Sequence, residues 1–366
     1  MGELARVAAM LGGIYLVFYV VLAALRTTVL PRSDVVLLTR WVFRAVHFIF
    51  RIRIKGAKDY VELDRRMAPY APIALVTLPW TWVTGVAIGF TAIDWGLHVD
   101  PLRRAFTLSA VSLTTLGSLS APDLPTIVVS VIEATLGLGL VALLISYLPS
   151  IYSAFQRREL QVARLATRAG DPPSAIVMIK RHHALDRLDA LDDMWDDYET
   201  WFSDIEETHS SQPSLVFFRS ISHQRSWITA AGVVLDSAAL RASTLDLPRE
   251  PRAELCIRAG YLSLRRIADY FSIPHDAAPN PTDAISIDRS EFDAAYDALV
   301  AEGVPVRPDR DQCWLDFAGW RVNYDRVLIT LAGLTYAPYA EWSSDRSIPY
   351  LAPLLNRDWR HRRGYG

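Results

Sequence analysis

The residues best suited to chemistry lie in the stretch Ser112–Asp123, directly before a long apolar run. Five consecutive residues are the candidates: Thr114, Thr115, Leu116, Gly117 and Ser118. Backbone carbonyl oxygens replace the water shell of a cation when several copies of such a loop form a ring. The stretch therefore predicts a cation-coordinating loop. The alternative is a short connecting loop in which the pattern arises by chance.

A second candidate is a cluster of imidazole and carboxylate groups in the C-terminal half. If residues 182–193 are one helix, four side chains share a face: His182, Asp186, Asp189 and Asp193. Such a face offers ligands to a divalent metal ion. Ten carboxylates and one arginine lie in Asp186–Glu207, so we favour a solvated acidic face. Docking of this face onto basic residues, either a stripe in the N-terminal half or the C-terminal tail, is the third interpretation.

No set of residues predicts catalysis. The sequence has no phosphate-binding loop and no dinucleotide-binding glycine pattern after a strand. It also lacks a recognisable group of nucleophile, base and orienting residue. Cys256 and Cys313 are too few for a disulfide framework or a zinc site, and the net charge of −2 gives no bias toward nucleic acid. We expect a protein that is not an enzyme, needs no cofactor and binds no nucleic acid.

The elements that must position these residues are membrane helices. Hydrophobic residues make up 51% of the chain and the mean hydropathy is +0.16. Three stretches, Val7–Leu25, Met67–Ile93 and Leu124–Gln156, are long enough to cross a bilayer, which takes about 20 residues. Basic residues gather between the first two stretches, which predicts that this segment is cytoplasmic. The protein is then a multi-pass protein of the cytoplasmic membrane with its C-terminal domain inside.

The segment Val35–Ile54 is apolar but carries a basic stripe. Arg40, Arg44, His47 and Arg51 recur there at helical spacing. We expect an amphipathic helix on the inner membrane surface, where the arginines contact anionic lipid. A fourth span or an ordinary core helix are the alternatives.

The connection between the last two spans is expected to dip into the membrane and return. Pro101 is suited to start a short helix that ends near Thr114, so its negative end points at the candidate loop. Glu133, in the last span, is expected to hold the loop by hydrogen bonds to Ser or Thr, or else to bind the ion directly. Gly137 and Gly139 predict either a hinge of that span or positions of close helix packing.

Four stretches resemble bacterial potassium-channel-like proteins that carry a helical cytoplasmic domain. They are Leu25–Pro31, Thr114–Gly117, Ile132–Gly137 and Ile145–Glu159. The resemblance extends to His209–Arg219 and Gln224–Trp227, and implies a two-helix pore-loop channel built from four copies. It also implies a selectivity filter at Thr114–Ser118 and potassium or another monovalent cation as the permeant ion.

The filter departs from the pattern of that family after Gly117. The family has an aromatic or aliphatic residue, a glycine and an aspartate there, whereas this chain has Ser118, Leu119 and Ser120. A side chain at the second glycine position opposes the backbone conformation that the glycine allows. These changes predict a filter with fewer ion sites and weaker selectivity, or a pore that no longer conducts.

The expected fold is an all-α membrane protein with four parts. Residues 1–30 form an N-terminal transmembrane helix, and residues 31–66 a basic linker with the amphipathic helix. Residues 67–156 form the pore module of helix, pore-loop and helix, and residues 157–366 a cytoplasmic helical domain. We expect a homotetrameric cation channel in the lipid bilayer. The alternatives are a non-conducting scaffold or sensor that acts through its helical domain, and a membrane-bound metal-dependent enzyme.

Overall fold

The computed structural model describes residues 2–28, 36–116 and 123–348 of the 366-residue chain. Within these residues every regular element is a helix, and β structure is limited to one bridge between Leu245 and Val306. Three helices are long and apolar enough to cross a membrane: Gly2–Thr28, Tyr60–Gly96 and Leu124–Ala169. Each contains one predicted span in full, so the prediction of an all-helical fold with three helices that could span a membrane is confirmed.

The chain divides into two compact units. The first comprises Met1–Gly56 and Arg66–Ser153, and the second comprises Ala57–Arg65 and Ala154–Gly366. The segment 31–66, expected as one linker, is therefore shared between the units. It contains a second short helix that the sequence analysis did not identify.

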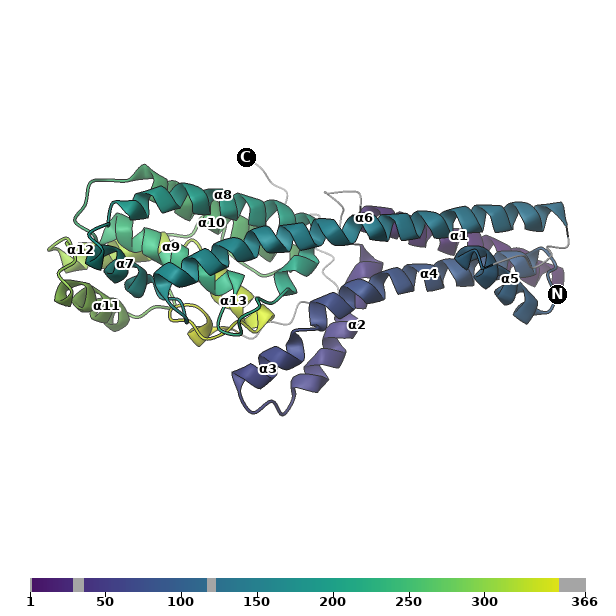
Figure 1. The fold of residues 1–366 in the computed structure, drawn as a ribbon, viewed down its shortest axis with the longest axis horizontal. Helices are drawn as coiled ribbons and strands as arrows, with labels where there is room; N and C mark the ends of the chain where they lie inside the picture. Colours follow the sequence, from purple (N-terminus) through teal and green to yellow (C-terminus); the bar gives the residue numbers. More distant parts are fainter. Residues whose placement is uncertain (1, 29–35, 117–122, 349–366) are drawn as a thin grey trace. The chain divides into compact units, whose positions relative to one another are not determined.

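The first unit is built from long helices with one short helix between them (Figure 1). They are α1 (Gly2–Thr28), α2 (Leu37–Ile54), α4 (Tyr70–Gly96), α5 (Leu102–Thr114) and α6 (Leu124–Ala169), of which α6 continues into the second unit after Ser153. The short α3 (Tyr60–Met67) begins in the second unit and ends in the first.

Close backbone contact joins α1 to α4. A Cβ atom on Gly13 would lie 2.4 Å from the carbonyl oxygen of Gly89, and one on Gly89 would lie 2.6 Å from Val17. Small residues bring helices together in a membrane, where there is little hydrophobic force between them. On α4, Gly85 and Gly89 are four residues apart and both face α1.

One stripe of α6 faces the rest of the first unit. Thr126, Glu133, Leu140 and Tyr147 are buried and recur every seven residues, which keeps them on one side of a helix. The other sides of α6 are apolar and exposed, for example at Val131, Leu138 and Ile145. This surface is suited to lipid or to other membrane helices.

The second unit is a helical bundle around α9 (Trp227–Ser243). Every residue of α9 except Ala242 is buried, as expected for a helix at the centre of a bundle. It is covered by α7, α10, α12 and α13, and α8 packs on α10 (Figure 1). The bounds are α7 (Ala175–Ala184), α8 (Ala190–Ser211), η1 (Pro213–Phe217), α10 (Pro251–Tyr270), α11 (Arg289–Ala301), α12 (Arg310–Arg321), α13 (Asp325–Thr335) and η2 (Ser344–Arg346).

The start of α9 is defined by a local cap. A short 3-10 turn ends at Phe217, and α9 begins only at Trp227. Ser226 caps α9 by accepting a hydrogen bond from the backbone of Ile228. Further along the chain, the apolar stretch Asp311–Leu334 is divided between two helices, α12 and α13.

Candidate functional site

The predicted cation-coordinating loop begins at the C-terminal end of α5. Thr115 takes a left-handed backbone conformation (φ 54°) and ends the helix, and the amide of Leu116 donates to the Val111 carbonyl at 3.1 Å. The Thr114 hydroxyl turns back to the Ala110 carbonyl. Leu116 is 79% exposed. The helix thus presents its negative end at an exposed part of the chain.

The remaining predicted filter residues, Gly117 and Ser118, lie outside the described residues, as do Leu119 and Ser120. The coordination assigned to Thr114–Ser118 therefore stays a prediction. The described part of the loop shows that α5 ends at Thr114.

Hydrogen bonds attach α5 to the helix on either side of it. The Ser109 hydroxyl oxygen lies 2.6 Å from Oε1 of Glu133 on α6 and 3.1 Å from the Ala87 carbonyl on α4. Both Ser109 and Glu133 are fully buried. Glu133 thus occupies the position expected of a residue that supports the loop, in contact with a serine; its role in conduction stays a prediction.

The two glycines of α6 have different surroundings. A Cβ atom on Gly137 would lie 2.3 Å from the Leu113 carbonyl, so this glycine lets α6 approach the last turn of α5. A Cβ atom on Gly139 would meet nothing within 4 Å among the described residues. Of the two interpretations left open, close packing fits Gly137, and Gly139 takes no part in it within the subunit.

The proposed metal-binding face does not form, because the helix is interrupted. Helix α7 ends at Ala184 and α8 starts at Ala190, with Asp186 in a left-handed conformation between them (φ 53°). His182 is buried, and its Nδ1 lies 2.8 Å from the Met178 carbonyl. Its pKa is lowered, chiefly by this burial.

The four residues His182, Asp186, Asp189 and Asp193 were expected on one helical face, and that expectation is wrong. In the described ranges, no three His, Cys, Asp or Glu side chains are grouped so as to hold a metal ion.

The acidic residues of α8 are balanced by arginines of the second unit itself. The pairs are Asp192 with Arg241 (3.1 Å), Asp193 with Arg252 (3.3 Å), Asp197 with Arg164 (2.8 Å), Asp204 with Arg157 (2.9 Å) and Glu206 with Arg266 (3.3 Å). These arginines come from α6, α9 and α10. The acidic face is therefore partly neutralised by arginines of the same unit, while Asp193 and Asp197 remain exposed to solvent, as the favoured interpretation expects.

Helix α2 has three faces. Val42, Val46 and Phe50 are buried, and the ring of Phe50 packs edge to face on Tyr70 of α4. A second, exposed face is apolar and consists of Leu37, Trp41, Phe48, Ile49 and Ile52. At 3.6 residues per turn, Arg40, Arg44 and Arg51 fall between these two faces. Basic side chains beside an exposed apolar stripe are typical of a helix at a membrane surface.

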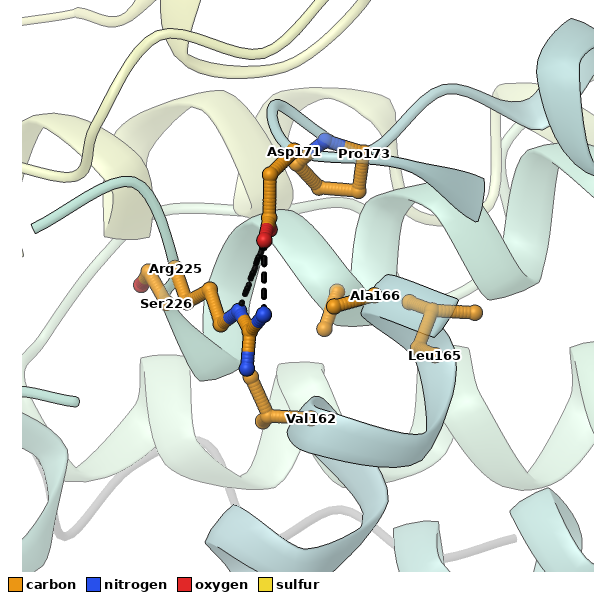
Figure 2. A pocket seen from close by; sticks show the side chains of 8 residues that line it. Val162, Leu165, Ala166, Asp171, Pro173, Arg225 and Ser226 are labelled. Atoms are coloured by element: carbon orange, nitrogen blue, oxygen red, sulfur yellow. Dashed lines mark hydrogen bonds and ion pairs between the residues drawn. The ribbon is translucent and has the colours of Figure 1, made fainter. Parts of the chain in front are cut away.

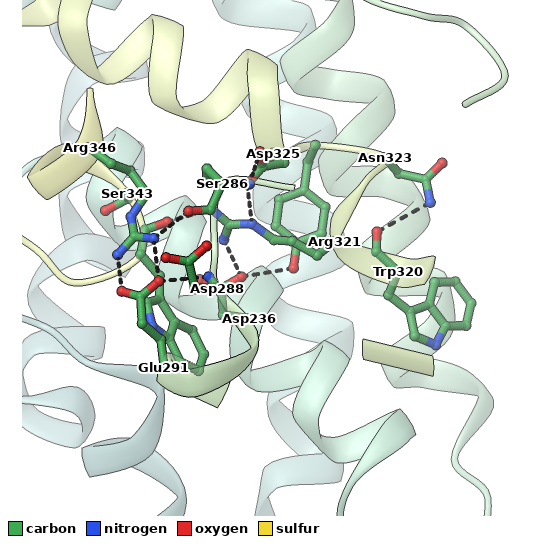
Figure 3. Close-up of polar contacts among 12 residues, drawn as sticks. Asp236, Ser286, Asp288, Glu291, Trp320, Arg321, Asn323, Asp325, Ser343 and Arg346 are labelled. Atoms are coloured by element: carbon green, nitrogen blue, oxygen red, sulfur yellow. Dashed lines mark hydrogen bonds and ion pairs between the residues drawn. The ribbon is translucent and has the colours of Figure 1, made fainter. Parts of the chain in front are cut away.

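A buried ionic cluster in the second unit was not found from the sequence (Figure 3). Arg321 is fully buried, and its guanidinium donates to Asp236 at 2.5 Å, to Asp325 at 2.8 Å and to the Trp342 carbonyl. Tyr324 donates to Asp236 at 2.9 Å, and burial raises the pKa of this hydroxyl well above its usual value. The cluster joins α9, α12 and α13. Its one sequence signal is the spacing of Arg321 and Asp325.

A second buried arginine, Arg158 on α6, holds the segment after α8. It donates to the carbonyls of Leu215 at 2.7 Å and Phe218 at 2.8 Å, and lies 3.3 Å from Nε2 of His209. His209 is fully buried, and burial together with the Arg158 charge holds its pKa well below the usual value. These contacts attach the C-terminal part of α6 to the segment after α8, within the second unit.

Figure 2 shows a small pocket in the second unit between α6 and the start of α9. Its walls are mainly apolar, with Val162, Leu165 and Ala166 from α6. Arg225 closes one side by a paired contact with Asp171 at 2.7 Å and 3.0 Å. The pair connects the chain after α6 to the chain before α9.

No family model matches this chain, and comparisons with curated proteins and with solved structures also find no match.

Proposed function

We propose that the protein is one subunit of a pore-loop cation channel. The observation that carries the proposal is the arrangement of α5. This short helix lies between two apolar helices, is hydrogen bonded to both through Ser109, and ends in an exposed turn at Thr115. The negative end of this helix is suited to attract a cation.

Four copies would surround the pore, because one loop supplies only part of a carbonyl ring. Closed rotational symmetry is the usual way for identical subunits to enclose a space. The exposed apolar sides of α6 and the exposed Leu116 offer the surfaces that neighbouring subunits and lipid would cover.

The permeant ion in this proposal is potassium or another monovalent cation, bound at Thr114–Ser118. The ion moves passively, without an enzymatic step and without a cofactor. Selectivity is weak, because Leu119 and Ser120 replace a glycine and an acidic residue of the channel pattern. The protein sits in the cytoplasmic membrane with its second unit inside, and the basic residues of α2 contact anionic lipid.

The same two residues favour a second candidate function. A bulky side chain at positive φ costs about 1–2 kcal/mol, and the cost recurs in each subunit. If Leu119 closes the filter, the protein is a non-conducting membrane scaffold or sensor that acts through its second unit.

The test is ion flux into liposomes that contain the purified protein, with potassium or sodium gradients. The variant Leu119→Gly with Ser120→Asp is measured in parallel, and native mass spectrometry counts the subunits. The proposal predicts four copies and cation flux in the native protein, with better discrimination between the two ions in the double variant. Flux in the double variant alone would support the scaffold. No flux in either protein would contradict the channel.

A further inference from the structure

The strongest unexplained feature is a pair of buried carboxyl groups behind α5. Asp94, near the end of α4, and Glu133, on α6, are both fully buried. Neither carboxyl oxygen of Asp94 has a hydrogen-bond partner among the described residues, and Oε2 of Glu133 has none there either. The two carboxyl groups are near enough to interact electrostatically.

No cation compensates this pair in the part of the chain that the structure describes. At this end of the helices, the other charged groups on or beside α1, α4, α5 and α6 are Glu3, Arg6, His98, Asp100, Arg103, Arg104 and Asp123. Arg6 is held by the Trp95 carbonyl at 2.8 Å and by Asp100 at 2.7 Å. His98 contacts Glu3, while Arg103, Arg104 and Asp123 are exposed. An isolated buried carboxylate is costly, and two that share a site cannot both be charged.

The hydrogen bonds of Ser109 give independent evidence about Glu133. The Ser109 hydroxyl has one proton but contacts two oxygens, Oε1 of Glu133 and the Ala87 carbonyl. The carbonyl can only accept. Both contacts are full hydrogen bonds only if Ser109 donates to Ala87 and a protonated Glu133 donates to Ser109. The short 2.6 Å contact fits such a carboxyl-to-hydroxyl bond.

We propose that Asp94 and Glu133 form a proton-binding site behind α5, with a proton held on Glu133 at neutral pH. The proton comes from water and converts the Glu133 carboxylate to the acid. When Glu133 loses this proton, Ser109 must donate to the carboxylate, and α5 gives up its bond to Ala87 on α4. The site thus connects proton binding to the attachment of the helix that carries the loop. The inference goes beyond the proposed function and does not depend on conduction.

The experiment is infrared spectroscopy of the full-length protein in lipid at neutral pH. The carbonyl stretch of a protonated carboxyl is resolved from the carboxylate bands and shifts in heavy water. We expect such a band in the native protein, its loss in Glu133→Gln, and its retention in the control Asp193→Asn, which changes an exposed carboxylate. Asp94→Asn should retain the band, because the proton is held on Glu133 and its bond to Ser109 does not involve Asp94.

Three results would overturn the proposal. One is a native spectrum without the band, and another is a band that survives in Glu133→Gln. The third is a band that appears only after potassium and sodium are removed, which would assign the site to a metal cation. If Glu133→Gln does not fold, the position of the band in Ser109→Ala is measured instead. A shift of the band supports the bond between Glu133 and Ser109, and an unmoved band contradicts it.

Discussion

At the scale of single residues, Gly137 and Gly139 lie two positions apart on α6 but have unlike surroundings. Gly137 lets the backbone of α6 approach the Leu113 carbonyl, whereas nothing within 4 Å among the described residues faces Gly139. A methyl group at Gly137 would meet backbone, which cannot move as a flexible side chain does.

We expect Gly137→Ala to destabilise the first unit by about 1–3 kcal/mol, because overpacking forces helices apart. Ion flux should fall as α5 is displaced. Thermal unfolding in detergent and liposome flux are the measurements, with Gly139→Ala as the matched control. Equal stability of the two variants would contradict the packing role assigned to Gly137.

Arg321 belongs to the buried cluster of the second unit. Replacing it with alanine leaves the carboxylates of Asp236 and Asp325 buried without their cation, which we expect to cost about 3–5 kcal/mol. The half-exposed Arg310, which pairs with Asp297, is the control, and its loss should cost about 1 kcal/mol or less. Denaturant unfolding of the full-length protein measures both. A loss at Arg321 no larger than that at Arg310 would show that the cluster is not a source of stability.

His209 makes the stability of the second unit depend on pH. Burial and Arg158 hold its pKa well below the usual value, so the folded protein keeps a neutral imidazole. The unfolded chain takes up a proton below about pH 6.5, which favours unfolding. The contribution of His209 is therefore present above that pH and is lost as the pH falls, at up to about 1.4 kcal/mol per pH unit.

His209→Gln should reduce this slope between pH 7 and pH 5, while His223→Gln, at an exposed site, should leave it unchanged. Denaturant unfolding at several pH values is the measurement. His182, which is also buried with a lowered pKa, is expected to account for part of the remaining slope. An unchanged slope in His209→Gln would mean that this histidine does not titrate on unfolding.

At the scale of elements, α2 is an apolar helix with a basic stripe, and its faces have different surroundings. One face packs on α4, and the exposed apolar face has no cover among the described residues. If α2 lies on the membrane, lipid covers this face.

Cysteine labelling tests the position of α2. Cysteines placed at Trp41 or Phe48 should react at least about tenfold more slowly with a charged thiol reagent in liposomes than one at Lys55, because lipid shields an apolar helix face. The native Cys256 and Cys313 are buried and give little background. Equal rates at all three positions would place the apolar face in water.

The long apolar helices could be predicted because composition and length alone define a membrane span. The interruptions between helices of the second unit could not be predicted from the sequence. Asp186, between α7 and α8, adopts positive φ without a glycine or proline to signal it. The turn between α12 and α13 depends on Asn323, whose side chain bonds to carbonyls of α12 and whose own carbonyl accepts from Arg265, 58 residues away. Contacts at such separation leave no local pattern.

The candidate site could also be predicted only in part. The sequence predicts that Glu133 requires a hydroxyl partner, since an intramembrane carboxyl needs one. It does not specify Ser109, because that choice depends on how α5 packs against α6. The pairing with Asp94 leaves no sequence signal for a similar reason, since the two residues come from different helices.

At the scale of the whole molecule, the central claim is that the loop after α5 conducts cations in an assembly of four subunits. Within the second unit, Arg158 joins the C-terminal part of α6 to the segment after α8.

The most direct test is the reversal potential of the purified protein in a planar bilayer with unequal potassium chloride on the two sides. The account predicts a current that reverses near the potassium equilibrium potential and is lost in Gly137→Leu. A bilayer without current, or a current that reverses near the chloride equilibrium potential, would contradict it.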